Sequence, residues 1–418
     1  MNIKVLKGDI ATSVSLNEIK TIKDGYIVVK DEICEGIFKE IPEEYKGVEI
    51  TDFTGQLIMP GLNDLHIHAP QYQFRGLDFD LDLLDWLHVN AFNEEAKYKD
   101  LEYAKKAYTI FVDELLASPT TRLSAFGTIH PKATLLLMEM LEEKGMAGNV
   151  GKVNMTRNAI DELHETVESS CEDTKRFIEQ SRKFKNIKPT ITPRFIPSCD
   201  DKLMYKLGEL GKKENVHFQS HLNEDASEIK WVKELCPWST SYGDAYDKFG
   251  MMNEKTIMAH CVYDYDLELM KDRGVWVAHC PECNANIRNG ISPVSKMLQM
   301  GIHVGMGTDV SGGSTINLFS SMRDALMMAK LRWKLVDDKY PPLTVEQVFY
   351  LATAGGGSYF GKVGMFEKGY EFDAIVFDDK RIKSTRDLNV KQRLERVIQV
   401  YGEADKLTAK YVKGNRLY

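Results

Sequence analysis

Eight short apolar runs of strand length recur along the middle of the chain, and most are followed by a segment with helical spacing, such as Lys99–Ala117 or Leu318–Leu335. The runs are Leu57–Leu62, Ser124–Ile129, Val150–Val153, Thr190–Phe195, Val216–His221, Thr256–His260, Val275–His279 and His303–Gly307. Eight strand-then-helix units in about 300 residues predict an α/β fold whose strands close into a (β/α)8 TIM-type barrel. A doubly wound open sheet is the alternative, but the first strand-to-helix turn lacks the G-x-G-x-x-G pattern that would favour it.

The two ends of the chain have a different sequence pattern, with short runs rich in Val and Ile that are separated by Gly or Asp. The runs are Lys4–Leu6, Gly25–Lys30 and Glu32–Phe38 near the amino terminus, and Phe372–Phe377, Val397–Val400 and Lys410–Val412 near the carboxyl terminus. Runs of this composition predict strands, so both ends are expected to be β-structure.

The 418 residues carry a formal net charge of −8. An acidic balance argues against a nucleic-acid partner, because phosphate binding needs a basic face. No run approaches the roughly 18 apolar residues of a membrane helix, and the first residues have no apolar core of the signal-peptide type. The seven cysteines are scattered and odd in number, unlike a disulfide framework. We therefore expect a cytoplasmic protein with reduced thiols and no membrane partner.

Histidines gather at the ends of the predicted strands. Six of the ten lie at or just beyond a carboxyl end: His66, His68, His130, His221, His260 and His279. The other four, His88, His164, His217 and His303, are expected to be surface or packing residues. In a barrel the carboxyl ends of the strands converge on the active-site face, so the six should meet there. His66 and His68 are two apart on a strand and point to one face, and imidazole suits Zn²⁺ or Fe²⁺.

Two carboxylates follow the same strand ends. Glu224 comes three residues after His221, where it could shuttle protons at a metal site, although an acid in the first turn of a helix is the simpler alternative. Asp309 follows the eighth strand and could be only a helix N-cap, but Ser311 or Ser314 could cap instead and leave it free as ligand and base. Cys280 and Cys283 form a single C-x-x-C pair, which we interpret as a loop with incidental thiols.

The segment Pro60-Gly61-Leu62-Asn63-Asp64-Leu65-His66-Ile67-His68 resembles the first-strand signature of the amidohydrolase superfamily. His221, His260 and Asp309 match that superfamily's further metal positions. The fourth-strand segment Thr190–Phe195 has no Lys of the kind that bridges two metals, so the resemblance is to the mononuclear deaminase branch. Within this branch the chain is most similar to the guanine deaminases. The motifs are His66–Tyr72, Thr192–Phe195, Ser220–Glu224, His279–Pro281, Gly307–Gly313, Leu351–Thr353 and Phe366–Phe377.

The resemblance implies an architecture and a set of residue roles. Both termini, residues 1–58 and 371–418, would build one small composite β-sandwich beside a metal-dependent hydrolase barrel at residues 59–370. The implied metal ligands are His66, His68, His221 and Asp309, and the implied catalytic residues are Glu224, Asp309 and His260, which orients the water. The implied substrate-binding residues are Gln71, Arg194, Phe195, His221, Glu224 and Asp309, and His279 would have a supporting role.

The implied activity is that of a zinc-dependent aminohydrolase, a hydrolase of C–N bonds in cyclic amidines. It would convert guanine and water into xanthine and ammonia in purine catabolism, with one Zn²⁺ per chain, or Fe²⁺ in its place. The family also implies a homodimer. Another mononuclear amidohydrolase that acts on an aminated purine, pterin or triazine is the second reading. A non-catalytic scaffold barrel is the third, but such relatives usually lack metal ligands that are present here. The segment Phe74–Asn93 is a candidate lid.

Overall fold

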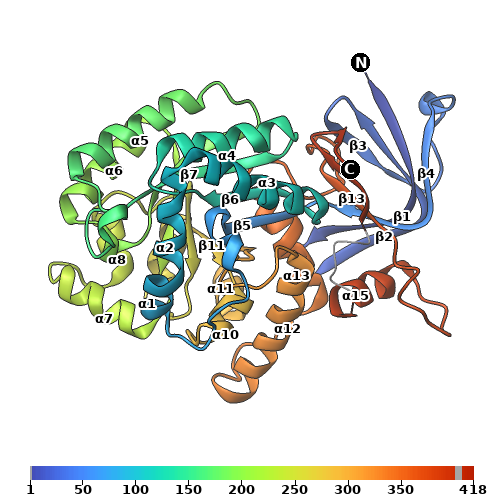
Figure 1. Cartoon of the computed structure of the whole chain (residues 1–418). Coiled ribbons are helices and arrows are strands. Elements are labelled where there is room, and N and C mark those ends of the chain that lie inside the picture. The colour runs from blue at the N-terminus through green and yellow to red at the C-terminus, as the bar shows by residue number, and fades with distance from the viewer. Residues whose placement is uncertain (1, 401–406) are drawn as a thin grey trace.

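Eight parallel strands close into a barrel in the computed structural model, which describes residues 2–400 and 407–418 (Figure 1). In chain order they are β5 (Leu62–His68), β6 (Thr120–Phe126), β7 (Ala147–Asn154), β8 (Ile187–Pro193), β9 (His217–Leu222), β10 (Thr256–His260), β11 (Trp276–His279) and β12 (His303–Met306). Each strand pairs with the next, and Met306 of β12 pairs with Asp64 of β5 to close the ring. The predicted (β/α)8 barrel is confirmed.

The first barrel strand lies further along the chain than the sequence pattern indicates. The run Leu57–Leu62 was expected to be that strand, but Leu57 and Ile58 belong to β4 (Ile50–Pro60), which pairs with a strand of the terminal sheet. The barrel strand β5 begins only at Leu62. Gly61 makes the transition possible, because a Cβ at this position would lie 2.1 Å from the Thr121 hydroxyl oxygen. His66 and His68 therefore lie within a barrel strand rather than after it.

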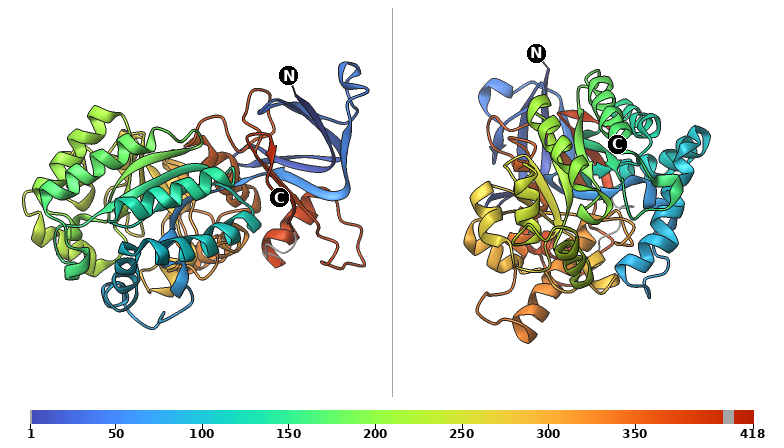
Figure 2. Two further views of the ribbon diagram at one scale, coloured as in Figure 1. Left: turned by 45° about the horizontal axis from the view of Figure 1, so that its top comes forward. Right: turned by 90° about the vertical axis from the view of Figure 1, so that its left-hand side faces the viewer.

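Helices surround the barrel and cover its outer face (Figures 1 and 2). The α-helices of this part of the chain, some of which reach the open end of the barrel, are α1 (Leu83–Trp86), α2 (Phe92–Ala96), α3 (Leu101–Ala117), α4 (Pro131–Glu143), α5 (Val167–Ser181), α6 (Asp201–Glu214), α7 (Ala226–Leu235), α8 (Tyr242–Lys248), α9 (Leu267–Arg273), α10 (Pro281–Asn286), α11 (Val294–Met300), α12 (Leu318–Leu335), α13 (Val345–Tyr350) and α14 (Gly356–Ser358). Helix α3 shows how the local sequence starts a helix and packs it against the barrel. Asp100 caps its first turn by accepting from two backbone N–H groups, and one apolar face, including Phe111 and Leu115, is buried.

The strands from the two chain ends form one mixed sheet of seven strands beside the barrel (Figure 2). Its order is β15-β14-β13-β4-β1-β2-β3, from β1 (Ile3–Ser15), β2 (Glu18–Lys30), β3 (Ile33–Phe38), β4, β13 (Ala374–Phe377), β14 (Leu407–Val412) and β15 (Asn415–Arg416). Its own apolar cluster includes Ile10, Ile27, Phe372 and Tyr411. A small β domain built from both termini is confirmed, whereas the exact division at residues 58 and 371 stays a prediction.

One terminal segment was predicted wrongly. Val397–Val400 was expected to be a strand, but it is the end of α15 (Val390–Val400). The buried residues Val390, Leu394, Val397 and Ile398 are spaced four, three and one apart, which places them on one helical face. The local Val-Ile-x-Val pattern resembles a strand, but the longer spacing determines the structure.

A buried ion pair joins the barrel to the terminal sheet. Arg122 of β6 donates from Nε to Asp373 Oδ2 at 2.6 Å and from Nη2 to Glu371 Oε2 at 2.7 Å. Arg122 and Asp373 are 6% and 2% exposed, so neither charge is left without a partner away from water. Of the helices in the described part of the chain, none has the length and apolar character needed to cross a membrane.

Candidate active site

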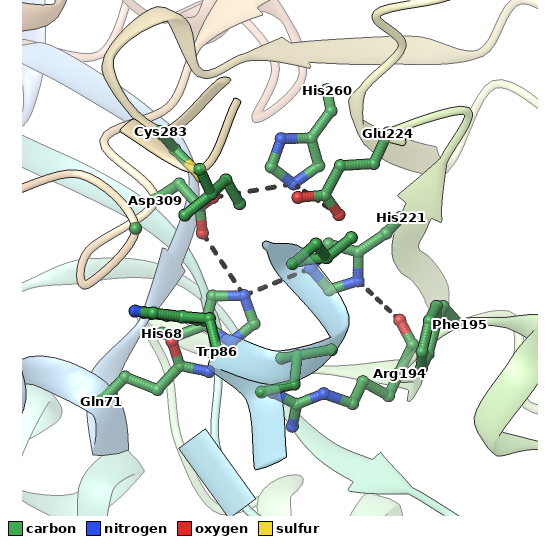
Figure 3. A pocket seen from close by; sticks show the side chains of 14 residues that line it. His68, Gln71, Trp86, Arg194, Phe195, His221, Glu224, His260, Cys283 and Asp309 are labelled. Carbon is green, nitrogen blue, oxygen red and sulfur yellow. Dashed lines mark hydrogen bonds and ion pairs between the residues drawn. The ribbon is translucent and has the colours of Figure 1, made fainter. Parts of the chain in front are cut away.

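Four of the strand-end histidines meet at the carboxyl end of the barrel. His66 and His68 come from β5, His221 from β9 and His260 from β10. His66, His68 and His221 each offer a ring nitrogen within 4.8 Å of the others, and His66 and His260 form a similar group with Asp309. Figure 3 shows His68, His221, His260 and Asp309 directed toward one centre. The barrel therefore brings together residues that are as much as 243 positions apart in the sequence, from His66 to Asp309.

The backbone at the strand ends aims the side chains. His260 and Asp309 have positive φ angles of 71° and 48°, a left-handed conformation that is uncommon for residues other than glycine and is often found at functional sites. Two hydrogen bonds attach the Asp309 segment to β5. Asp309 N donates to His66 O at 2.9 Å, and His68 N donates to Val310 O at 3.0 Å. Asp309 is thus held next to the two histidines of β5.

The outer nitrogens of two rings are held by hydrogen bonds, which determines where the inner nitrogens point. His221 Nδ1 donates to the Arg194 carbonyl oxygen at 2.6 Å, and His260 Nδ1 donates to Asn284 Oδ1 at 2.9 Å. In a neutral ring the other nitrogen, Nε2, then carries a lone pair directed into the site. Orientation of this kind is typical of metal-binding histidines.

The donor atoms fit a divalent metal. His68 Nε2 and His221 Nε2 face each other at 3.3 Å, and His66 Nε2 lies 3.1 Å from Asp309 Oδ1. His66 Nε2 and His260 Nε2 are buried and have no hydrogen-bond partner among the described residues. Buried nitrogens of this kind are costly unless another group satisfies them, and imidazole nitrogens and carboxylate oxygens are ligand types that Zn²⁺ takes in catalytic sites.

The electrostatics of the site favour neutral His68 and His221 rings beside an ionised Asp309 carboxylate. Burial lowers the pKa of His68 and His221 well below the usual value, and the neighbouring histidines lower it further. Burial alone would raise the pKa of Asp309, but its close contacts with His66, His260 and His68 outweigh burial and hold that pKa well below its usual range. Neutral imidazole and carboxylate are the protonation states that bind metal.

Glu224 faces the same centre, but its pKa is shifted in the opposite direction to that of Asp309. Its Oε1 accepts from Asn289 Nδ2 at 2.9 Å, and its Oε2 lies 3.4 Å from His260 Nε2. Burial and the charge of Asp309 raise the pKa of Glu224 well above the usual value, against the hydrogen bond from Asn289. Two neighbouring carboxyl groups with pKa values driven apart are typical of acid–base chemistry.

A pocket opens beside this centre and contains the predicted substrate residues (Figure 3). Gln71, Arg194 and Phe195 line it together with His68, His221, Glu224, His260 and Asp309. The candidate lid segment also contributes, since Leu83, Trp86 and Leu87 lie against the pocket. The pocket thus joins a metal-type donor set to one guanidinium, one amide and a rim of aromatic and aliphatic side chains.

Several residues that sequence patterns did not identify support the site. Asp64 accepts from His66 N at 3.2 Å and from the Thr308 hydroxyl at 2.5 Å, which connects β5 to the segment after β12. Burial raises the pKa of Asp64 to about 7, against hydrogen bonds from Thr308. Asn284 and Asn289 hold His260 and Glu224, and Glu95 contacts Gln71 and Arg194. The spacing of these polar residues carries no signal that would separate them from surface residues.

Two of the six strand-end histidines do not join the cluster. The strand β6 ends at Phe126 rather than Ile129, so His130 lies at the start of α4, where it lines a different cavity with Tyr98 and Lys99. His279 does end β11, but it lines a cavity with Ser292 and Arg332 instead of the pocket. The prediction that all six converge was therefore wrong for His130 and His279.

Other sequence expectations need smaller corrections. The fourth barrel strand includes Lys188, but this residue lies at the amino end of β8, opposite to the site. Neither Ser311 nor Ser314 caps the helix after Asp309, because Asn317 caps α12. Cys283 is buried and lines the pocket, so the C-x-x-C pair is not simply a loop with incidental thiols. Burial and the charge of Asp309 raise the pKa of Cys283 well above the usual value, which favours an inert thiol.

Comparison with known proteins agrees with this geometry. Residues 57–414 match the family model described as Amidohydrolase family. A guanine deaminase of Dictyostelium discoideum is 33% identical over 99% of this chain and 98% of its own length, and one of Escherichia coli is 31% identical over 96% and 92%. A crystal structure of guanine deaminase from C. acetobutylicum, with bound guanine in the active site, covers 100% of both chains at 40% identity and a TM-score of 0.97. The chain belongs to the amidohydrolase family, in the group that contains the guanine deaminases.

Proposed function

We propose that this chain hydrolyses guanine to xanthine and ammonia. The observation that carries the proposal is one pocket in which a metal-type donor set adjoins Arg194 and Gln71. The relatives support it, because guanine deaminases match nearly the whole chain in sequence and in structure. In the reaction the oxygen of water bonds to C2 of guanine, the bond from C2 to its amino nitrogen breaks, and ammonia leaves with the proton that it needs.

His66, His68, His221 and Asp309 would hold the metal, as one Zn²⁺ per chain or one Fe²⁺. When bound, a divalent ion polarises a water and makes it acidic enough to act near neutral pH. His260 is held by Asn284 and lies 3.6 Å from Asp309 Oδ2, where it orients the water. Asp309 and His260 then help to remove the first proton.

Glu224 carries protons between water and substrate. Asn289 donates to Oε1, which leaves Oε2, the oxygen nearer His260, to accept and release the proton. A raised pKa favours the protonated form of this carboxyl group, which can give its proton to a ring nitrogen of guanine and later to the departing amine. Arg194 donates toward the O6 side of the purine, and Phe195 packs against the ring plane.

Ultraviolet monitoring of guanine conversion by the metal-loaded protein tests the proposal. We expect xanthine to form, and formation to stop when a chelator removes the metal. No conversion by protein shown to contain metal would contradict the proposed substrate, and another aminated purine, pterin or triazine would then be tested.

Replacing Arg194 with alanine should lower kcat/KM for guanine by about 30- to 1,000-fold, because a buried charged hydrogen bond is worth about 2–4 kcal/mol. The metal content should stay that of the parent protein, since His221 is held by the backbone carbonyl of Arg194, which alanine retains. Metal analysis alongside the kinetics checks both statements. Loss of metal from this variant would contradict the assignment of Arg194 to the substrate side.

The finer features of the protein also belong to the proposal. We propose a cytoplasmic homodimer that acts in purine catabolism, with a terminal β domain at residues 1–58 and 371–418 and a barrel at residues 59–370. A row of exposed apolar side chains on α12, Met327, Leu331 and Leu335, supports a contact between subunits. Six of the seven cysteines are buried and all are free thiols, which fits a reducing compartment. The mass in solution, measured by light scattering, tests the dimer.

A further inference from the structure

Glu95 of α2 is a fully buried carboxylate that does not line the pocket and contacts two residues that do. Its exposed fraction is 0%, and both of its oxygens accept from Arg194 Nη1, at 2.9 Å and 2.7 Å. Its Oε1 also accepts from Gln71 Nε2 at 2.9 Å. The same helix supplies Phe92, whose ring centre lies 5.2 Å from the guanidinium carbon of Arg194. The short helix α2 therefore holds Gln71 and Arg194, the two residues that we call the pocket wall.

This arrangement determines which hydrogen-bonding atoms remain for a ligand. A carboxylate only accepts hydrogen bonds, so Gln71 must turn its NH₂ group toward Glu95. Its carbonyl oxygen is then the atom left for the pocket, where it acts as an acceptor. Arg194 uses Nη1 for Glu95, and the rest of its guanidinium is left as a donor. The wall thus offers a donor beside an acceptor.

A guanine ring offers the complement along one edge, since the O6 carbonyl is an acceptor and the adjacent N1–H is a donor. We infer that Glu95 is the positioning residue that orients Gln71 and Arg194 to recognise the O6/N1–H edge of the purine. This inference rests on the proposed function and goes beyond it, because it names the residue that determines which pocket atoms donate and which accept hydrogen bonds. Glu95 acts through its two partners and touches neither the metal donors nor the reacting atoms.

The test replaces Glu95 with glutamine, which has nearly the same size. An amide in this position has a donor where the carboxylate had an acceptor, so at least one contact with Arg194 or Gln71 becomes donor to donor. We expect KM for guanine to rise by about tenfold or more, kcat to stay within about threefold, and metal content to be unchanged. Glu94→Gln is the matched control, because the Glu94 carboxylate binds Lys97 and Tyr103 instead of the pocket wall, and its constants should stay near those of the parent protein.

Inhibition by 2-aminopurine separates recognition of this edge from a general loss of structure. This purine keeps the C2 amino group but lacks both O6 and N1–H, so its inhibition constant should change by less than about twofold in Glu95→Gln. Equal weakening of guanine and 2-aminopurine, or an unchanged KM for guanine, would overturn the inference. Glu95→Asp, which keeps the charge, should raise KM less than Glu95→Gln and serves if the latter folds poorly. If the parent protein does not deaminate guanine, the proposed function fails, and the inference fails with it.

Discussion

Replacing Glu224 with glutamine should lower kcat for guanine by about 10²- to 10⁴-fold, the range that general acid–base groups contribute. Glutamine keeps the shape of the side chain and can still accept from Asn289 Nδ2, so the pocket and its neighbours keep their packing. It cannot take a proton from water and pass it to the purine. KM for guanine and metal content should therefore stay close to those of the parent protein. Steady-state kinetics with metal analysis provide the measurement.

Asp225→Asn is the matched control for this variant. Asp225 is the next acidic residue along the chain, but its side chain caps α7 by accepting from Ser227 N. Asparagine is also a good N-cap, so this variant should retain near-parent turnover. Turnover by Glu224→Gln close to that of Asp225→Asn would remove Glu224 from the mechanism, and another group would have to carry the proton.

The course of the chain through the barrel could be predicted from short apolar runs, but the ends of the strands could not. The run Leu57–Leu62 spans the end of a strand in one sheet and the start of a strand in another, and the residues on both sides of Gly61 are buried. The strand β6 ends three residues before the apolar run does, which moves His130 out of the site. Strand ends depend on pairing with neighbouring strands, which no local pattern encodes.

In the candidate site too, some residues could be predicted from the sequence and others could not. His66, His68, His221, Glu224, His260 and Asp309 could be identified because each follows or ends a barrel strand, and the topology brings those ends together. Glu95 gives no such signal, because it lies on a helix of five residues beside another glutamate. Its role depends on a contact with Arg194, which is 99 positions away. Residues that orient others are selected by tertiary contacts and become visible only in the structure.

Removing the metal should abolish turnover and also lower the stability of the barrel. The inner nitrogens of His68 and His221 lie 3.3 Å apart, and a metal ion held by both rings would replace this single contact with two metal–nitrogen bonds. A ligand that binds only the folded protein adds about 4 kcal/mol at a thousandfold excess over Kd, so the unfolding temperature should rise as Zn²⁺ or Fe²⁺ is titrated into chelated protein. Calorimetry with each ion measures this without reference to activity.

His221→Ala and His130→Asn separate a specific metal site from general binding to histidine. His221 lies near the end of β9 and His130 comes shortly after β6, but only His221 faces the other donor atoms, whereas His130 begins α4. Loss of one of the four ligands should weaken metal binding by about 10²-fold or more. The His130 side chain makes no cap hydrogen bond at the start of α4, and asparagine suits an N-cap position, so this variant should fold normally and leave metal binding unchanged. If both variants bound metal like the parent protein, the ion would lie outside the cluster of His66, His68, His221 and Asp309. The water and the purine would then have to react elsewhere in the barrel, so this pair of variants tests the location of the chemistry as well as the identity of the ligands.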